Sequence, residues 1–301
     1  MTSTHTHDGH QRTPAHVTWR ADVALVVAAF FFGTTFVVVK DAIDEVAPMA
    51  FLGVRFLIGA AVLALAARGR PASPHELRHG VFGGMALWAG YAFQTVGLQY
   101  TDPSTSAFLT YLLVVFVPIL GFVFLRKPLH PTTGLGILLA VAGLVLMTGG
   151  ADRSVGRGEV LTLGCAVAFA AHIVIVGQTA WRHDAVRLTC IQIATVGVVS
   201  VLVSLAGGAH DVVFGGAPLA AAAFTGVCAT AVAFLAMVWA QKFVSPSRAA
   251  LILLLEPVFA ALLSWVGGDT LTLTSALGGL LILVAVVVAE VLPTLLTTRS
   301  R

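Results

Sequence analysis

Ten apolar segments follow one another along the chain, separated by charged residues, proline or glycine. A helix needs about 20 mainly apolar residues to cross the roughly 30 Å hydrocarbon core of a membrane. The segments cover residues 21–39, 49–67, 79–98, 104–125, 132–148, 158–177, 188–206, 217–241, 247–266 and 272–291. This pattern predicts an all-α integral membrane protein with ten transmembrane helices.

The composition agrees with this interpretation and excludes a water-soluble globule. Hydrophobic residues make up 58% of the 301 residues and charged residues only 10%, which leaves too little polar surface for a domain in water. The formal net charge is +3, but the basic residues lie in short clusters between apolar segments and not along one stripe. The lipid bilayer is therefore an expected partner, and nucleic acid is not.

The distribution of lysine and arginine predicts the orientation of the chain. Cytoplasmic loops keep positive charge during membrane insertion. If the N-terminus lies inside, 13 of these residues fall on the cytoplasmic side and 3 on the outer side, while Arg55 remains within the second span. We expect a multi-pass protein of the plasma (inner) membrane with cytoplasmic tails at residues 1–19 and 293–301.

The chain also matches itself when it is shifted by 143 residues. Residues 97–112 then lie over residues 240–255, and Pro103 matches Pro246 at a junction between loop and helix. A preserved polar step of this kind favours a duplication over a chance likeness of apolar segments. The predicted repeats are residues 20–150 and 157–292. Because each contains an odd number of helices, they would be inverted, as in many secondary transporters whose solute site lies between the repeats.

Several of these segments resemble the EamA-like branch of the drug/metabolite transporter superfamily, and the likeness runs from Ala21 to Glu290. The matching pieces are Phe31 to Lys40, Arg55-Phe56, Gly97 to Pro118, Ser245 to Pro257 and Gly278-Gly279. The resemblance implies a secondary active transporter that moves a small metabolite, amino acid or drug-like solute by alternating access; members of the family export or import, and export is the favoured direction. It also implies a cavity lined by the first, third, fourth, sixth, eighth and ninth helices. It does not identify the substrate.

Glu256 is the most informative single residue, because it falls near the centre of the ninth span. An unpaired charge there costs at least about 2.5 kcal/mol. Pro257 has no amide hydrogen, so it should kink this helix, and Pro118 should interrupt the fourth span in the first half. Paired interruptions predict a cavity wall. Glu256 either binds substrate or a proton, or it is a structural carboxyl that fixes helix packing, and the sequence leaves both open.

Other polar side chains within the spans are candidates for the substrate or proton pathway. His172 could relay protons or contact an anionic solute, although a neutral histidine bonded between helices is the structural alternative. Arg55 could attract anions, but snorkelling or pairing with Asp44 or Asp102 favours a structural role. The remaining candidates are Tyr91, Gln94, Thr110, Tyr111, Gln178, Gln192, Trp88 and Trp239.

The run from His75 to His79 matches the HExxH pattern of zinc proteases. It lies in a short basic loop without an evident third ligand, so a solvated helix start is favoured over an intramembrane metalloenzyme that uses His75, Glu76 and His79. We therefore expect no enzymatic activity, no metal and no cofactor.

Two further expectations concern energy coupling and partners. The sequence has no Walker loop and no connection long enough for a nucleotide-binding domain, so a gradient should drive transport, and proton coupling is the hypothesis. A non-transporting scaffold would need a long soluble interaction segment, which the sequence lacks. The small residues Gly136, Ala140 and Gly143 could support a homodimer or packing within one chain.

Overall fold

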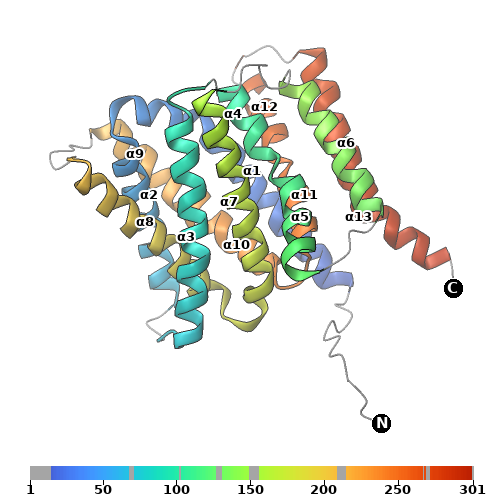
Figure 1. Cartoon of the computed structure of the whole chain (residues 1–301), viewed down its shortest axis with the longest axis horizontal. Coiled ribbons are helices and arrows are strands. Elements are labelled where there is room, and N and C mark those ends of the chain that lie inside the picture. Colours follow the sequence, from blue (N-terminus) through green and yellow to red (C-terminus); the bar gives the residue numbers. More distant parts are fainter. Residues whose placement is uncertain are drawn as a thin grey trace, which may run out of the picture.

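The computed structural model describes residues 15–67, 71–101, 103–126, 131–148, 156–208, 215–266, 268 and 272–299. These residues form helices that run between two faces of the molecule (Figure 1). We call the face at which α1 and α3 begin the lower face, as it lies in Figure 1, and the opposite one the upper face. Helix α13 also ends toward the lower face.

The first half of the chain supplies α1 (Ala15–Glu45), α2 (Pro48–Ala67), α3 (Pro74–Gly97), α4 (Pro103–Tyr111), α5 (Leu113–Leu125) and α6 (Pro131–Thr148). The second half supplies α7 (Arg157–Thr179), the 3-10 turn η1 (Ala180–Arg182), α8 (Ala185–Ala206), α9 (Gly216–Thr225), the π-helix η2 (Gly226–Val232), α10 (Ala233–Ala240), α11 (Pro246–Leu253), α12 (Glu256–Val266) and α13 (Leu273–Arg299). Helix α9 continues through η2 into α10.

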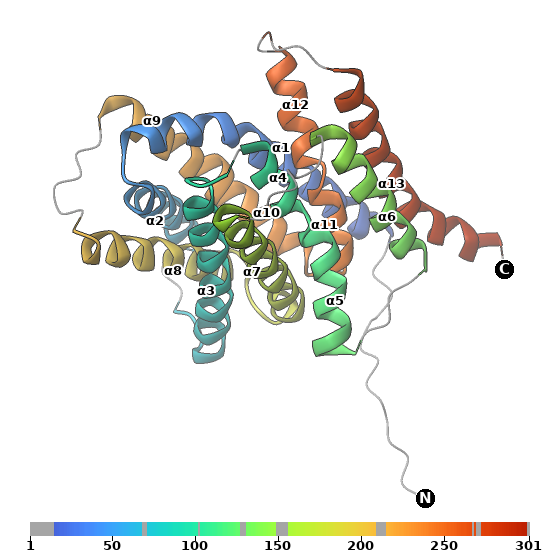
Figure 2. The same ribbon diagram turned by 45° about the horizontal axis from the view of Figure 1, so that its top comes forward.

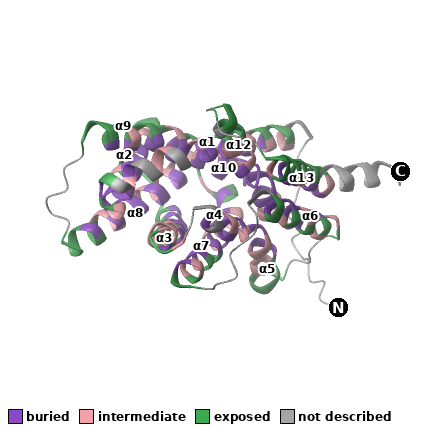
Figure 3. Cartoon of the chain, turned by 90° about the horizontal axis from the view of Figure 1, so that it is seen from above, coloured by how far each residue is buried: buried purple, intermediate pink, exposed green. Residues whose placement is uncertain are grey.

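The helices are long and apolar enough for a membrane. Within the described residues, seven segments meet this requirement: Val17–Thr35, Pro48–Ala67, Ser106–Leu125, Arg157–Arg182, Ala185–Ala206, Gly216–Ala240 and Pro246–Leu263. Large apolar side chains such as Leu65 and Phe124, which are 82% and 74% exposed, face outward as they would in lipid. Figure 3 shows buried positions gathered toward the interior of the bundle. The chain is an all-helical integral membrane protein.

Several helices begin where the sequence supplies a cap. The side chains of Ser73 and Ser245 each accept a hydrogen bond from the backbone N–H three residues later, at the starts of α3 and α11. Pro74 and Pro246 follow them as the first helical residues, where the missing N–H costs no intrahelical bond. These short polar steps set where each helix starts at the lower face.

Helices from opposite halves of the sequence pack against each other. Helix α2 packs on α8, α3 on α7 and α8, and α1 on α10 and α12, whereas α1 and α2 scarcely touch. Figure 2 shows α6 and α13 side by side at one edge of the bundle. The halves are therefore interleaved, and neither encloses a core of its own.

The small residues of α6 face α13. A Cβ on Gly136 would lie 2.6 Å from the Ala289 Cβ, and one on Gly143 would lie 2.7 Å from the Gly278 carbonyl oxygen. The α6 backbone can approach α13 this closely only because these positions lack side chains. This face of α6 serves packing within the chain.

Another close backbone contact joins α2 to η2. A Cβ on Gly226, the first residue of η2, would lie 2.7 Å from the carbonyl oxygen of Arg55, and one on Gly59 would lie 2.8 Å from the carbonyl oxygen of Gly226. The two backbones thus touch beside Arg55. This contact fixes the position of Arg55 relative to η2.

Two helices are interrupted near their middle, at equivalent places in the two halves. Helix α11 ends at Leu253 and α12 begins at Glu256, directly before Pro257, which cannot donate the bond that a continuous helix needs. In the first half the interruption lies at Leu112, between α4 and α5.

The prediction that Pro118 interrupts the fourth span is wrong, because Pro118 lies inside α5. The carbonyl that loses its bond to Pro118 belongs to Val114, in the first turn of α5. The helix therefore restarts just before the region that the proline ring affects, and the break falls N-terminal to the proline.

The α2–η2 contact predicts a strong effect of a side chain at Gly226. Gly226→Leu should lower the thermal midpoint of the detergent-solubilised protein, because overpacking of a close helix contact costs about 1–3 kcal/mol. Gly121→Leu is the matched control, since a Cβ on Gly121 meets no atom within 4 Å. Equal midpoints for the two variants would contradict the close contact.

Candidate functional site

A cavity of about 420 Å³ lies within the bundle. This volume is in the range of small-molecule sites, which is roughly 300–1,000 Å³. Helices α1, α3, α4, α5, α7, α10, α11 and α12 line it, so the spans implied by the family resemblance all contribute. Helix α2 lines it as well, through residues that include Phe51 and Arg55.

The cavity extends through the interior of the bundle to the upper face. Val39 and Ile43 line it from the end of α1, Pro48 from the start of α2, and Thr95 from the end of α3. All four positions belong to the upper parts of their helices. At the other end it reaches Met237, three residues before the end of α10, and Ala250, four residues after the start of α11.

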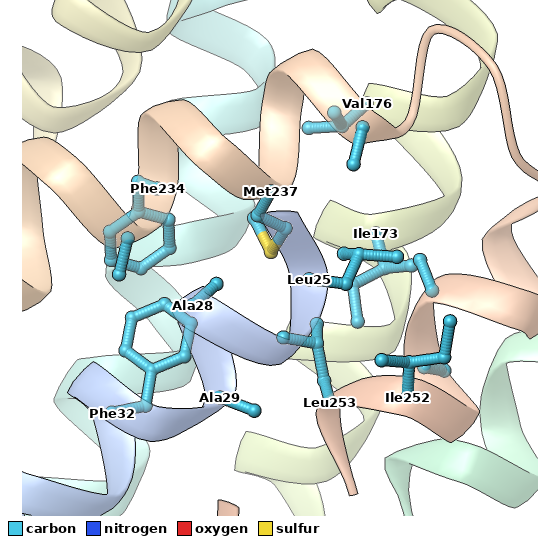
Figure 4. Packing of buried hydrophobic residues seen from close by; sticks show 14 of the residues in the cluster. Leu25, Ala28, Ala29, Phe32, Ile173, Val176, Phe234, Met237, Ile252 and Leu253 are labelled. Carbon is cyan, nitrogen blue, oxygen red and sulfur yellow. The ribbon is translucent and has the colours of Figure 1, made fainter. Parts of the chain in front are cut away.

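Below the cavity the helices close together in what we call the floor cluster. Figure 4 shows side chains of α1, α7, α10 and α11 converging there. Four of these residues, Leu25, Ala28, Ala29 and Val176, are completely buried. The labelled members are Leu25, Ala28, Ala29, Phe32, Ile173, Val176, Phe234, Met237, Ile252 and Leu253. Phe32, Ile173, Phe234, Met237 and Leu253 also line the cavity, whereas Leu25, Ala28, Ala29 and Val176 lie further toward the lower face and close the cavity there.

An ion pair joins α1 to α11 beneath the floor cluster. Arg248 donates from Nε to Asp22 Oδ1 at 2.9 Å and from Nη2 to Oδ2 at 2.6 Å. This two-point geometry suits a guanidinium and a carboxylate. Asp22 lies one helical turn before Leu25 on α1. The ion pair and the floor cluster therefore both hold α1 against α11.

Arg55 brings a positive charge to the cavity wall. Its side chain is only 4% exposed, and its Nε donates to Thr230 Oγ1 of η2 at 3.0 Å. Its guanidinium carbon lies 5.6 Å from the ring centre of Phe56 and 5.7 Å from that of Tyr91. A π-helical turn widens a helix locally and is frequent at functional sites. Here that turn supplies the hydroxyl that orients Arg55.

Glu256 brings a negative charge to the same cavity. It is the first residue of α12, directly after the helix interruption. A Cβ on Gly33 would lie 2.8 Å from the Glu256 carbonyl oxygen, and the Phe30 and Phe259 rings lie 5.5 Å apart. Helix α1 therefore passes close beside this residue and fixes it. Among the described contacts, no direct ion pair joins Glu256 to Arg55.

His172 lines the cavity and is held from behind by Gln192. A ring nitrogen of His172, Nε2, lies 3.0 Å from Gln192 Oε1, and Gln192 is completely buried between α7 and α8. The amide oxygen can only accept, so Nε2 carries the proton in this arrangement. His172 is thus bonded between helices and also faces the cavity.

The cavity brings together about half of the residues expected from the sequence. Glu256, His172, Tyr91, Gln94, Thr110 and Tyr111 line it. The other candidates, Pro257, Gln178, Gln192, Trp88 and Trp239, do not.

Helix rotation explains which of these residues reach the cavity. Leu87 and Tyr91 are four residues apart and share one face of α3, which turns Trp88 aside. Trp239 packs instead against Phe243, with ring centres 5.2 Å apart. Sequence reasoning gave Arg55 a structural role, yet it lines the cavity. The side chains of Asp44 and Asp102, its suggested partners, lie outside the described residues.

The hydroxyl of Tyr111 adds a polar group without a normal partner. Tyr111 is 4% exposed, and within the described residues its hydroxyl makes no hydrogen bond of ordinary geometry, although it lies near the Glu256 carboxyl. Buried polar groups are normally satisfied. Because both side chains line the cavity, the Tyr111 hydroxyl and the Glu256 carboxyl form one polar region of its wall.

The HExxH run has a structural use in this fold. Glu76 is 2% exposed and accepts from Arg187 Nε at 3.0 Å and from the Asp184 amide at 3.2 Å. His79 Nδ1 lies 2.8 Å from His183 Nε2. The described part of the chain holds no group of three His, Cys, Asp or Glu side chains placed to bind a metal ion. Glu76 therefore anchors α3 to α8 and is not free to act as a general base.

A membrane-embedded helical bundle around a mainly apolar cavity that holds a few polar and charged side chains is typical of a multi-pass membrane protein of the transporter class. The chain belongs to the EamA-like transporter family, whose model matches residues 19–149 and 156–290. This membership confirms the resemblance to the EamA-like branch of the drug/metabolite transporter superfamily.

Individual relatives support the same assignment. An uncharacterized transporter of Archaeoglobus fulgidus is 31% identical over 275 residues, which cover 90% of this chain and 85% of the relative. The uncharacterized transporter YoaV of Bacillus subtilis is 22% identical over 280 residues, covering 86% and 93%. A solved crystal structure of another protein has the same fold, with a TM-score of 0.78, 22% identity and coverage of 92% of this chain and 98% of that one.

The His172–Gln192 contact predicts a measurable contribution to stability. Gln192→Leu leaves a buried imidazole N–H unpaired, so the free energy of unfolding should fall by about 1–3 kcal/mol. Gln178→Leu is the control, because Gln178 lies on α7 outside the cavity. Thermal midpoints in detergent test this, and a Gln192→Leu midpoint as high as that of the control would contradict the role of the contact.

Proposed function

We propose that this protein is a secondary active transporter that exports a small metabolite, amino acid or drug-like solute across the plasma membrane by alternating access. Ten membrane-spanning helices would form two inverted five-helix repeats, residues 20–150 and 157–292, with both termini in the cytoplasm. Membership of a transporter family supports transport as such.

The packing of the helices supports the inverted repeats. If each helix is exchanged for its counterpart in the other half, the α1–α10 contact becomes α7–α3, and α1–α12 becomes α7–α5. The α2–α8 and α6–α13 contacts become themselves. The interruptions at Leu112 and before Glu256 also correspond under the shift found in the sequence. A two-fold relation between the halves accounts for all of these pairs.

The single observation that carries the proposal is the difference between the two ends of the cavity. It extends toward the upper face, while the floor cluster and the Asp22–Arg248 ion pair close it from the lower face. Arg78, Arg182 and Lys242 lie near the lower face, which is where cytoplasmic charge is expected. The conformation then corresponds to an outward-directed state, and export requires a second state in which the floor cluster parts.

Glu256 is the residue proposed to couple transport to protons, because it is the carboxyl group among the described residues that line the cavity. A solute is first identified by overexpressing the protein and screening tolerance to toxic amino acids, analogues and drugs. In proteoliposomes, a pH gradient should accelerate wild-type flux of that solute severalfold. Glu256→Gln should abolish the acceleration and most of the flux, because the amide cannot carry a proton.

The matched control is Glu45→Gln, which neutralises an exposed carboxylate at the end of α1 and should transport normally. If the pH gradient does not change the wild-type flux, the hypothesis of proton coupling is wrong. If Glu256→Gln transports as fast as the wild type, Glu256 has only a structural role.

The Asp22–Arg248 ion pair is expected to affect the equilibrium between the state open to the upper face and the state open to the lower face. Asp22→Asn should favour the state that opens toward the lower face, because it weakens a partly buried pair worth about 1 kcal/mol. In a background without Cys165, Cys190 and Cys228, labelling of Ala29→Cys by a membrane-impermeant maleimide from the cytoplasmic side should rise severalfold. The exchanged pair Asp22→Arg with Arg248→Asp should restore slow labelling. Labelling that is unaffected by Asp22→Asn would show that the ion pair does not close the floor.

A further inference from the structure

Positive charge gathers at one place on the lower face, where α3 begins and α7 ends (Figure 1). His79 of α3 and His183, which follows η1, approach each other with 2.8 Å between Nδ1 and Nε2. Lys242, just after α10, donates from Nζ to the His183 carbonyl oxygen at 3.1 Å. Arg78 and Arg182 are charged neighbours of His79. We call these five residues the lower basic patch.

The carboxylates beside the lower basic patch are already engaged. Glu76 is buried and forms its ion pair with α8, and Asp184 Oδ1 caps the start of α8 at 3.0 Å from a backbone N–H. Within the described residues, no ion pair involves Arg78, Arg182 or Lys242. Their positive charges are therefore not neutralised by this part of the protein.

His183 responds to the electrostatic potential of the patch. Burial lowers the pKa of His183, and the nearby charges of Arg182 and Arg187 lower it further. His75 acts in the same direction, and Glu76 opposes them. Cations that make a neighbouring imidazole harder to protonate attract an anion for the same electrostatic reason.

The patch lies at the depth of the lipid headgroups. The apolar span Arg157–Arg182 ends here, and Trp181 is 58% exposed. The guanidinium carbon of Arg182 lies 4.5 Å from the Trp181 ring centre. Tryptophan is enriched at the interface between hydrocarbon and water, and basic groups between helices at this depth suit the headgroups of anionic lipids. The exposed side chains of Trp181 and Leu77 offer apolar contact that a lipid can use and a free anion cannot.

We propose that the lower basic patch binds the phosphate group of an anionic phospholipid. Arg78 and Arg182 pair with the phosphate, because a planar guanidinium matches its oxygens at two points. Lys242 adds a third charge, since its ammonium has two hydrogens beyond the one given to the His183 carbonyl. The bound headgroup ties α3, η1 and the end of α10 together and so stabilises the fold. This site is separate from the central cavity and does not depend on the transported solute.

The charge of the lipid provides the first test. Phosphatidylglycerol, phosphatidylcholine and glycerol 3-phosphate are added separately to the full-length protein in a neutral detergent, and the thermal midpoint is followed with concentration. Phosphatidylglycerol should raise the midpoint saturably, with a half-maximal concentration at least about fivefold lower than that of phosphatidylcholine, because each basic residue favours the anionic lipid. Glycerol 3-phosphate, which lacks acyl chains, should have no effect at the same concentrations.

Variants locate the site. Arg182→Gln should raise the half-maximal phosphatidylglycerol concentration about fivefold, and Arg78→Gln combined with Arg182→Gln roughly 25-fold. Both side chains are exposed, so these variants should fold. Arg157→Gln is the matched control, because Arg157 lies over the Tyr100 ring at 4.6 Å on the upper face, two residues from the Glu159 carboxylate. It should leave the lipid response unchanged.

Four results would overturn the proposal. Equal responses to phosphatidylglycerol and phosphatidylcholine would show that the lipid charge is not recognised. An unchanged response in the double variant would place any lipid site elsewhere, and an equal loss in Arg157→Gln would indicate general attraction to basic residues. A response to glycerol 3-phosphate at the same concentrations would indicate a site for free anions. None of these measurements requires transport, so the proposed function stands or falls separately.

Discussion

The interior of this protein depends on keeping the charges of Arg55 and Glu256 away from lipid. A charge exposed to hydrocarbon is costly, so each residue must face either protein or a polar space. The close backbone contacts at Gly226 and Gly33 meet this requirement by pressing η2 against α2 and α1 against α12. The cavity follows from this arrangement, because it is the space toward which both charges can point.

The closure of one end follows from the same helices. Helix α1 carries Asp22 near the lower face, apolar residues from Leu25 to Phe32 at the floor, and Thr35 at the cavity wall, all at helical spacing along one side. A single stripe therefore serves as ion-pair partner, seal and cavity lining. A rotation or tilt of α1 would change all three together, which suits an element that distinguishes two states.

The sequence predicted the helices well and the cavity only in part. Apolar runs between charges locate the helices, because lipid imposes their length, and Glu256 stands out because a carboxyl is rare at that depth. Trp88 and Trp239 do not line the cavity, because the direction of a side chain depends on helix rotation, which neighbours from the other half determine. The hydrogen-bond partner of Arg55 could not be foreseen, because Thr230 is distant in sequence and lies on a π-helical turn. The prediction for Pro118 failed because a proline removes one backbone hydrogen bond but does not fix the residue at which the helix breaks.

The interleaving of the two halves has a consequence for how the chain matures during synthesis. The partners of α2 and α3 are α7 and α8, so the first five segments to leave the ribosome enter the bilayer before the surfaces that cover them exist. Their glycine-lined faces, at Gly53 and Gly84 among others, remain exposed to lipid until the helix that carries Val201 and Gln192 is synthesised and inserted. Assembly of the nascent protein is thus a late, concerted event, and an amino-terminal fragment alone has no native structure to reach.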